Sequence, residues 1–265
     1  MPDRPPRGHV SAPRIFTPEY YARMRDLEDA SWWNAGMRDV AARLLVAASL
    51  SSAGTMVDVG CGSGQTITWF GLIYPGWRTI GLDVAPDGLA AGRARGTRLL
   101  FCGSALELPL PSSIAELVVS LDVLQHLPLG GGDRRALAEM HRVLKPDGHL
   151  FVRTNAQAFP RTPDDPVFQF HKYDPGELRS VLDAAGFEVV RLGRVNALLG
   201  LAEIPRELRA RRDEHTYHGL LSQPRTDSTI VGRMKRGWLR VEGGLLARGY
   251  TLPLGRTLMA LCRRA

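Results

Sequence analysis

Short apolar runs alternate with amphipathic segments along most of the chain, and this alternation predicts an α/β fold. A run at 56–59 predicts a buried strand, and the 3.6-residue spacing of 65–73 predicts the helix that follows it. The same reading predicts further strands at 78–83, 98–102, 116–121, 148–153, 187–194 and 257–262, and helices at 86–95, 132–144 and 174–185. Alternating strands and helices with short turns are typical of a doubly wound parallel sheet.

Residues 17–50 are predicted to be helical and to precede the first strand. Thr17 before Pro18 and Glu19 has the order of an N-cap, a first-turn proline and an acidic first turn. A second helix is predicted from residue 36 or 37 to Leu50, with Val40, Leu44 and Leu45 on one face. Residues 1–16, rich in proline and arginine without an apolar stretch, are predicted to be a disordered tail and not a secretory signal.

The glycine-rich stretch at 57–65, Val-Asp-Val-Gly-Cys-Gly-Ser-Gly-Gln, indicates a cofactor site. Its glycines allow a sharp turn and a close approach of the backbone to a ligand. Asp83 ends the next strand, where a carboxylate can accept hydrogen bonds from both ribose hydroxyls. The glycine spacing differs from the G-x-G-x-x-G of dinucleotide sites. Asp58 would repel a phosphate but attract a ligand that carries an amino group and a sulfonium.

This combination of glycines and acids resembles motif I of the class I S-adenosylmethionine (SAM) methyltransferases. The resemblance implies a Rossmann-like, seven-stranded, mostly parallel sheet. Its last strand would be antiparallel, inserted between the fifth and fourth strands or beside the sixth. It also implies SAM as cofactor and S-adenosylhomocysteine as product, with Asp58 orienting the methionyl amine, Asp83 holding the ribose and Val84 packing on adenine. The full set of cofactor-binding residues that it implies is Asp58, Gly60, Cys61, Gly62, Gly64, Asp83, Val84, Ser104, Ala105, Leu106 and Leu121.

One position departs from the family pattern. Ser104 stands where such methyltransferases usually have an aspartate for the adenine amine. A serine hydroxyl still accepts a hydrogen bond, but without the assistance of a charge.

Two histidines are candidates for proton removal from an acceptor. His126 follows the fourth strand at the ligand edge, and His171 follows the fifth strand after a long loop. For each, a structural role is the alternative: packing or capping the next helix for His126, and anchoring the loop for His171. The side chains predicted to line the acceptor space are Tyr21, Trp33, Gln125 and Tyr173. Methyl transfer requires no metal, and we predict none.

The predicted organisation is a methyltransferase core with a helical cap. The tail at 1–16 is followed by an N-terminal helical lid at 17–50 and a SAM-binding core at 51–196. Residues 197–254 leave the carboxyl end of a parallel strand and so are expected to cover the ligand side as a helical cap insertion. Residues 255–265 contain the last core strand.

Composition narrows the partners and the compartment. The net charge of +7 is concentrated in residues 186–265, which hold 15 basic and 7 acidic residues, yet only three of the 34 basic residues of the chain are lysines. This arginine excess indicates a compositional bias, so we do not expect a nucleic-acid partner. No apolar run approaches the roughly 18 residues of a membrane span. Three cysteines without metal-type spacing fit a reducing, cytoplasmic setting. The sequence is compatible with a homodimer as well as with a monomer.

The sequence therefore predicts a bacterial SAM-dependent methyltransferase that acts on a small organic acceptor, with secondary metabolites or glycan precursors as the expected classes. One alternative is a protein of the same fold that catalyses a non-methylating rearrangement or uses SAM as a scaffold. The lower alternative is an RNA methyltransferase. Leu121-Asp122-Val123-Leu124 argues against it, because it stands where base-methylating enzymes carry a tetrad such as Asn-Pro-Pro-Tyr.

Overall fold

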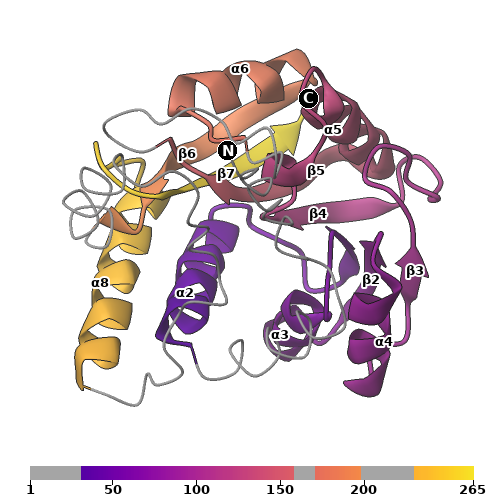
Figure 1. Ribbon diagram of the computed structural model, residues 1–265, viewed down its shortest axis with the longest axis horizontal. Helices are drawn as coiled ribbons and strands as arrows, with labels where there is room; N and C mark the ends of the chain where they lie inside the picture. Colours follow the sequence, from indigo (N-terminus) through magenta and orange to yellow (C-terminus); the bar gives the residue numbers. More distant parts are fainter. Residues whose placement is uncertain (1–30, 158–170, 198–229) are drawn as a thin grey trace, which may run out of the picture.

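The computed structural model describes residues 31–157, 171–197 and 230–265 of the chain. Its helices and strands alternate as the sequence pattern predicts (Figure 1). In chain order they are α2 (Trp32–Val46), β1 (Gly54–Val59), α3 (Gln65–Ile73), β2 (Trp77–Asp83), α4 (Pro86–Ala94), β3 (Leu100–Cys102), β4 (Ala115–Leu121), the 3₁₀ turn η1 (Leu124–His126), α5 (Gly132–Val143), β5 (Leu144–Asn155), α6 (Pro175–Ala184), β6 (Phe187–Val195), α8 (Ile230–Ala247) and β7 (Thr257–Arg264).

The seven strands form one sheet in the order β3-β2-β1-β4-β5-β7-β6. The strands β1 to β5 are parallel, and β7 runs antiparallel to both β5 and β6. The predicted fold class is confirmed, including the antiparallel last strand. Its place is between β5 and β6, so the alternative placement between the fifth and fourth strands is wrong: β4 and β5 pair directly, leaving no gap for another strand.

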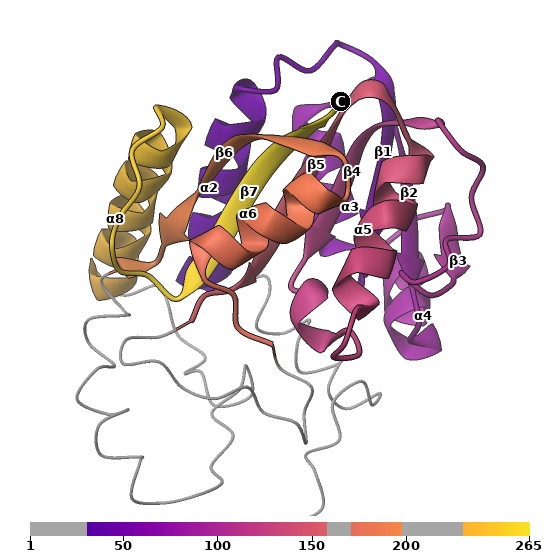
Figure 2. The same ribbon diagram turned by 90° about the horizontal axis from the view of Figure 1, so that it is seen from above.

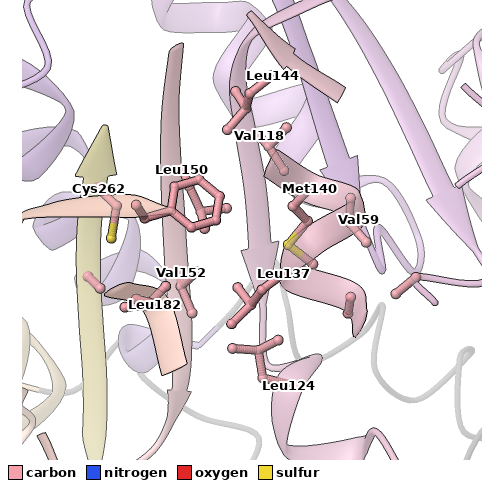
Figure 3. Close-up of a cluster of buried hydrophobic side chains, with 14 of the residues drawn as sticks. Val59, Val118, Leu124, Leu137, Met140, Leu144, Leu150, Val152, Leu182 and Cys262 are labelled. Atoms are coloured by element: carbon pink, nitrogen blue, oxygen red, sulfur yellow. The ribbon is translucent and has the colours of Figure 1, made fainter. Parts of the chain in front are cut away.

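Helices cover both faces of the sheet. Figure 2 shows α5 and α6 on one face and α2 and α8 on the other. Side chains alternate along β4 accordingly: Val118 joins the core cluster under α5 and α6, whereas Leu117 and Val119 join the cluster under α2 and α8. Figure 3 shows part of the first cluster, in which Leu137 and Met140 of α5 lie against the sheet. Such a two-layered core fixes the carboxyl ends of β1, β2, β4 and β5 relative to one another.

The helix before the sheet begins earlier than predicted. Ser31 is the N-cap of α2, and its Oγ accepts a hydrogen bond from Asn34 N at 3.4 Å. The helix ends at Val46, before the predicted end at Leu50. Its buried face contains Val40, Leu44 and Leu45, as the pattern indicates, and packs on the sheet as part of the core. The first predicted helix and the tail lie outside the described residues.

The predicted cap is described only in its last part. Within 197–254, α8 packs along α2 and β6 on the same face of the sheet (Figure 1). Residues 198–229 lie outside the described residues, so covering of the ligand side by this segment remains a prediction. In the part of the chain that the structure describes, no helix is long and apolar enough to cross a membrane.

Candidate active site

The glycine turn after β1 has a left-handed backbone that favours glycine. Gly60, Gly62 and Gly64 have φ angles of 79°, 51° and 71°. A Cβ at Gly60 would lie 2.2 Å from Cγ2 of Val123. The amides of Gly60 and Cys61 donate to the Leu82 carbonyl at 2.7 and 2.9 Å, which fixes the turn against β2. The turn therefore presents bare backbone at the carboxyl edge of the sheet, directly before α3.

Asp58 is a buried acid, and one of its carboxylate oxygens has no hydrogen-bond donor among the described residues. Its side chain is 1% exposed, and the oxygen without a donor is Oδ2. Burial, reinforced by the nearby Asp83 charge and opposed by Arg153, raises the pKa of Asp58 to about 7. A buried carboxylate oxygen with no donor is costly, and a cationic group bound beside it would remove that cost.

Asp83, at the end of β2, is held in one orientation by the backbone. Its Oδ2 accepts from Gly62 N at 2.7 Å and its Oδ1 from Ala85 N at 2.8 Å. Burial nevertheless raises the pKa of this carboxyl, although these hydrogen bonds lower it. Each carboxylate oxygen has more than one acceptor position, so both can still accept from a ligand hydroxyl.

The loop after β3 is built as a tight turn beside β2. Ser104 Oγ accepts from Leu106 N at 3.2 Å, and Arg135 Nε donates to the Leu106 carbonyl at 2.8 Å. Ala105 is 9% exposed, whereas Val84, which directly follows β2, is 61% exposed. An apolar side chain beside a polar turn can bind a flat heteroaromatic ring. The Ser104 hydroxyl already accepts a hydrogen bond within its own loop.

An ion pair that the sequence analysis missed closes the edge between β4 and β5. Arg153 Nε donates to the two carboxylate oxygens of Asp122 at 3.1 and 3.0 Å, and its guanidinium lies 4.9 Å from the Trp33 ring centroid. Asp122 has a φ of 59°, in the left-handed region. The only sign of this ion pair in the sequence is that Arg153 directly follows the apolar run from Leu150 to Val152.

A small cavity of about 50 Å³ lies between α2, the start of α3 and the ends of β4 and β5. Apolar side chains from the strands, such as Leu121 and Phe151, and from the helices, such as Met37 and Phe70, make up much of its lining. The polar side chains that line it are Asn34, Arg38, Gln65, Thr66 and Arg153. Because Gln65 directly follows Gly64, this cavity adjoins the glycine turn.

Comparisons with known proteins agree with this geometry. The sequence profile of the "Methyltransferase domain" family matches residues 57–152, which contain the glycine turn, Asp83 and β4. A Mycobacterium tuberculosis protein named "Probable S-adenosylmethionine-dependent methyltransferase" is 29% identical over 221 residues, covering 82% of this chain and 74% of its own. A trans-aconitate 2-methyltransferase from Azoarcus is 29% identical over 143 residues, or 54% of this chain and 53% of its own.

Residues 57–152 therefore form a methyltransferase domain, and the chain has the fold of the class I SAM-dependent methyltransferases. Two solved structures show how widely this fold is shared. The SAM complex of a Haemonchus contortus phosphoethanolamine N-methyltransferase has a TM-score of 0.60 at 15% identity, covering 94% of this chain and 57% of the other. The [4+2]-cyclase SpnF has a TM-score of 0.54 at 21% identity, covering 94% and 97%.

The residues present fit SAM as cofactor of this methyltransferase. Asp58 has an unpartnered buried oxygen beside which a methionyl ammonium would fit, and the glycine turn leaves space that a Cβ would fill. The structure brings Asp83 onto the same turn through its hydrogen bond from Gly62. When bound, SAM supplies a methyl group on an electrophilic sulfonium centre.

Next to His126, the side chain of Gln125 connects the turn after β4 to the end of β5 by hydrogen bonds. Gln125 Oε1 accepts from Asn155 N at 2.9 Å and from Thr154 Oγ1 at 3.3 Å. Gln125 is 5% exposed, so its contacts favour a structural role over the predicted contact with an acceptor. His126 is the last residue of η1, and burial lowers its pKa while the Asp122 charge opposes this.

The second histidine belongs to the junction with α6. His171 Nε2 lies 2.7 Å from Glu177 Oε1, and its ring packs edge-on against Tyr173 at 4.3 Å between centroids. Tyr173 is 1% exposed, and its hydroxyl donates to Asp133 at 3.2 Å. These contacts favour the loop-anchoring alternative for His171 and a structural role for Tyr173. Tyr21 lies outside the described residues.

Proposed function

We propose that this methyltransferase transfers the methyl group of SAM to a small organic acceptor, releasing S-adenosylhomocysteine. The use of SAM as cofactor is supported above all by the buried, unpartnered Asp58 oxygen beside the glycine turn. The acceptor half is supported by the relative that methylates trans-aconitate and by the sequence after β4, which lacks the polar-proline tetrad of base methylation.

His126 is our candidate for the group that accepts a proton from the acceptor. Burial lowers the pKa of its imidazole, which favours the neutral, basic form at neutral pH. Exchanging His126 for asparagine is expected to lower kcat at least tenfold for a hydroxyl acceptor and to remove the acidic limb of its pH profile. An unchanged pH profile would return His126 to a structural role.

The arrangement around Arg153 supports the proposal by ordering the edge where an acceptor would enter. It forms an ion pair with Asp122, which has a left-handed φ, and its stacking on Trp33 joins α2 to this edge. We propose that Trp33 forms an apolar wall of the acceptor space. Trp33 thus remains a predicted lining residue of the acceptor space, as the sequence analysis has it.

Methyl transfer is tested directly with SAM that carries a deuterated methyl group. The enzyme is incubated with this SAM and a panel of small carboxylic acids, alcohols, phenols, thiols and amines, and in a parallel reaction with RNA. Mass spectrometry follows S-adenosylhomocysteine and labelled product together. Equimolar formation of both supports the proposal. The cyclase among the structural neighbours makes one other result informative. An acceptor that is converted while SAM stays intact would show a rearrangement, and label transferred only to RNA would show an RNA methyltransferase.

A further inference from the structure

The outer face of α8 exposes a continuous apolar stripe. Its large apolar side chains are between 44% and 70% exposed: Ile230, Val231, Met234, Trp238 and Val241, which we call the α8 stripe. At 3.6 residues per turn these positions fall within about 100° of the helix circumference. Folded proteins seldom leave so many large apolar side chains together in water without a partner.

The stripe is separate from the face that α8 buries. Leu239 and Leu246 are 1% exposed and belong to the core cluster that includes α2. On the same buried side, the Glu242 carboxylate accepts hydrogen bonds from the backbone amides of Asn196 and Ala197. Figures 1 and 2 both place α8 at the outer edge of the molecule, beside α2. Packing within the described residues therefore explains one face of α8 and leaves the stripe unexplained.

Three basic side chains of α8 flank the stripe at helical spacing, Arg233, Lys235 and Arg240, and no exposed acid of α8 offsets them. The helix carries Arg233, Lys235, Arg236 and Arg240 against one acid, Glu242, which is 1% exposed. Asp39 of α2 pairs with Arg236 and Arg240 at 2.7 and 2.8 Å, so one carboxylate is shared by two guanidinium groups. The exposed face is consequently apolar in its centre and cationic at its margins.

We propose that the α8 stripe docks this enzyme on the surface of an anionic lipid bilayer. Apolar side chains that include a tryptophan would enter the headgroup region, while the flanking arginines and lysine would meet anionic headgroups. Charge disfavours a second copy of the chain as occupant, because pairing α8 with α8 would bring like-charged margins together. It also disfavours RNA, which would satisfy the basic margins but give the stripe no apolar partner.

The test is co-sedimentation of the full chain with lipid vesicles. We expect binding to vesicles that contain phosphatidylglycerol and at least tenfold weaker binding to pure phosphatidylcholine vesicles. Raising the salt concentration from 0.1 to 0.5 M should weaken binding, since exposed charges are screened. The double variant Met234→Asp with Val241→Asp should lose at least tenfold in affinity. A matched control, Val46→Asp with Leu72→Asp, changes two apolar residues that are 74% and 79% exposed outside the stripe and should bind like the wild type.

Three results would overturn the proposal. These are a wild-type protein that stays in the supernatant with anionic vesicles, equal losses in both double variants, and a dimer or RNA complex that only the stripe variant abolishes. Unfolding of each variant is followed by circular dichroism to show that it is folded. Because vesicle binding is measured without SAM or acceptor, its failure would leave the proposed methyl transfer standing.

Discussion

Exchanging Asp58 for asparagine should change how the stability of the enzyme depends on pH. In the cofactor-free protein, burial raises the pKa of Asp58 to about 7 from an ordinary value of 3.8. Between these values the folded chain binds a proton at Asp58 that the unfolded chain has lost. Stability that comes from this site is therefore full at low pH and decreases as the pH rises toward 7.

The expected size follows from the two pKa values. One pKa unit corresponds to about 1.4 kcal/mol, so the full effect is about 4 kcal/mol, and the part between pH 5 and pH 7 is about 2 kcal/mol. An asparagine at this position keeps the size of the side chain but does not titrate. The free energy of unfolding of the wild type, relative to the Asp58→Asn variant, should fall by that amount over this range and stay level above it.

Urea denaturation of both proteins at pH 5, 6, 7 and 8 without SAM measures this difference. Asp147→Asn is the control, because Asp147 has an 82% exposed side chain and a left-handed φ of 61° that asparagine tolerates. It should show no comparable dependence relative to the wild type. Parallel profiles for the wild type and the Asp58→Asn variant would refute a buried, proton-binding Asp58.

The remaining predictions concern α8. Gly243→Ala would place a Cβ 3.0 Å from the Val40 backbone and should destabilise the fold by about 1–3 kcal/mol, whereas Gly237→Ala meets no atom within 4 Å and should stabilise it by up to about 1 kcal/mol. Thermal unfolding of the pair checks this, and equal shifts would contradict the helix contact. Glu242→Ala should cost about 2–4 kcal/mol, because the amides of Asn196 and Ala197 lose their buried acceptor. A loss below 0.5 kcal/mol in urea denaturation would show that these amides find other partners.

Most of the fold could be predicted because local patterns and topology agreed. The apolar runs that became β1, β2 and β4 are short and bounded by turn residues, and α3 has the predicted bounds. The position of β7 could not be derived from its own residues, since an apolar run that fits between β5 and β6 would fit beside other strands equally well. The start of α2 was predicted too late, at residue 36 or 37, although Ser31 is a good N-cap.

The cofactor half of the site was predictable for a physical reason. Glycines with positive φ and an acid at a strand end leave a signature within a few residues of sequence. The contacts around the proposed acceptor space were not predictable, because they join distant segments. Arg153 meets Asp122 from 31 residues away, and Gln125 binds the end of β5 from a separate turn. Only the folded chain shows that Gln125, His171 and Tyr173 form hydrogen bonds with other residues of the protein.

Calorimetric titration of SAM into the cofactor-free enzyme tests the central claim most directly. We predict saturable binding to one site, weakened about tenfold or more by Asp83→Asn, which removes a charged acceptor, and unchanged by Asp147→Asn. Absence of binding by the wild type, or equal affinities in all three proteins, would contradict a SAM site built on the glycine turn and its two acids.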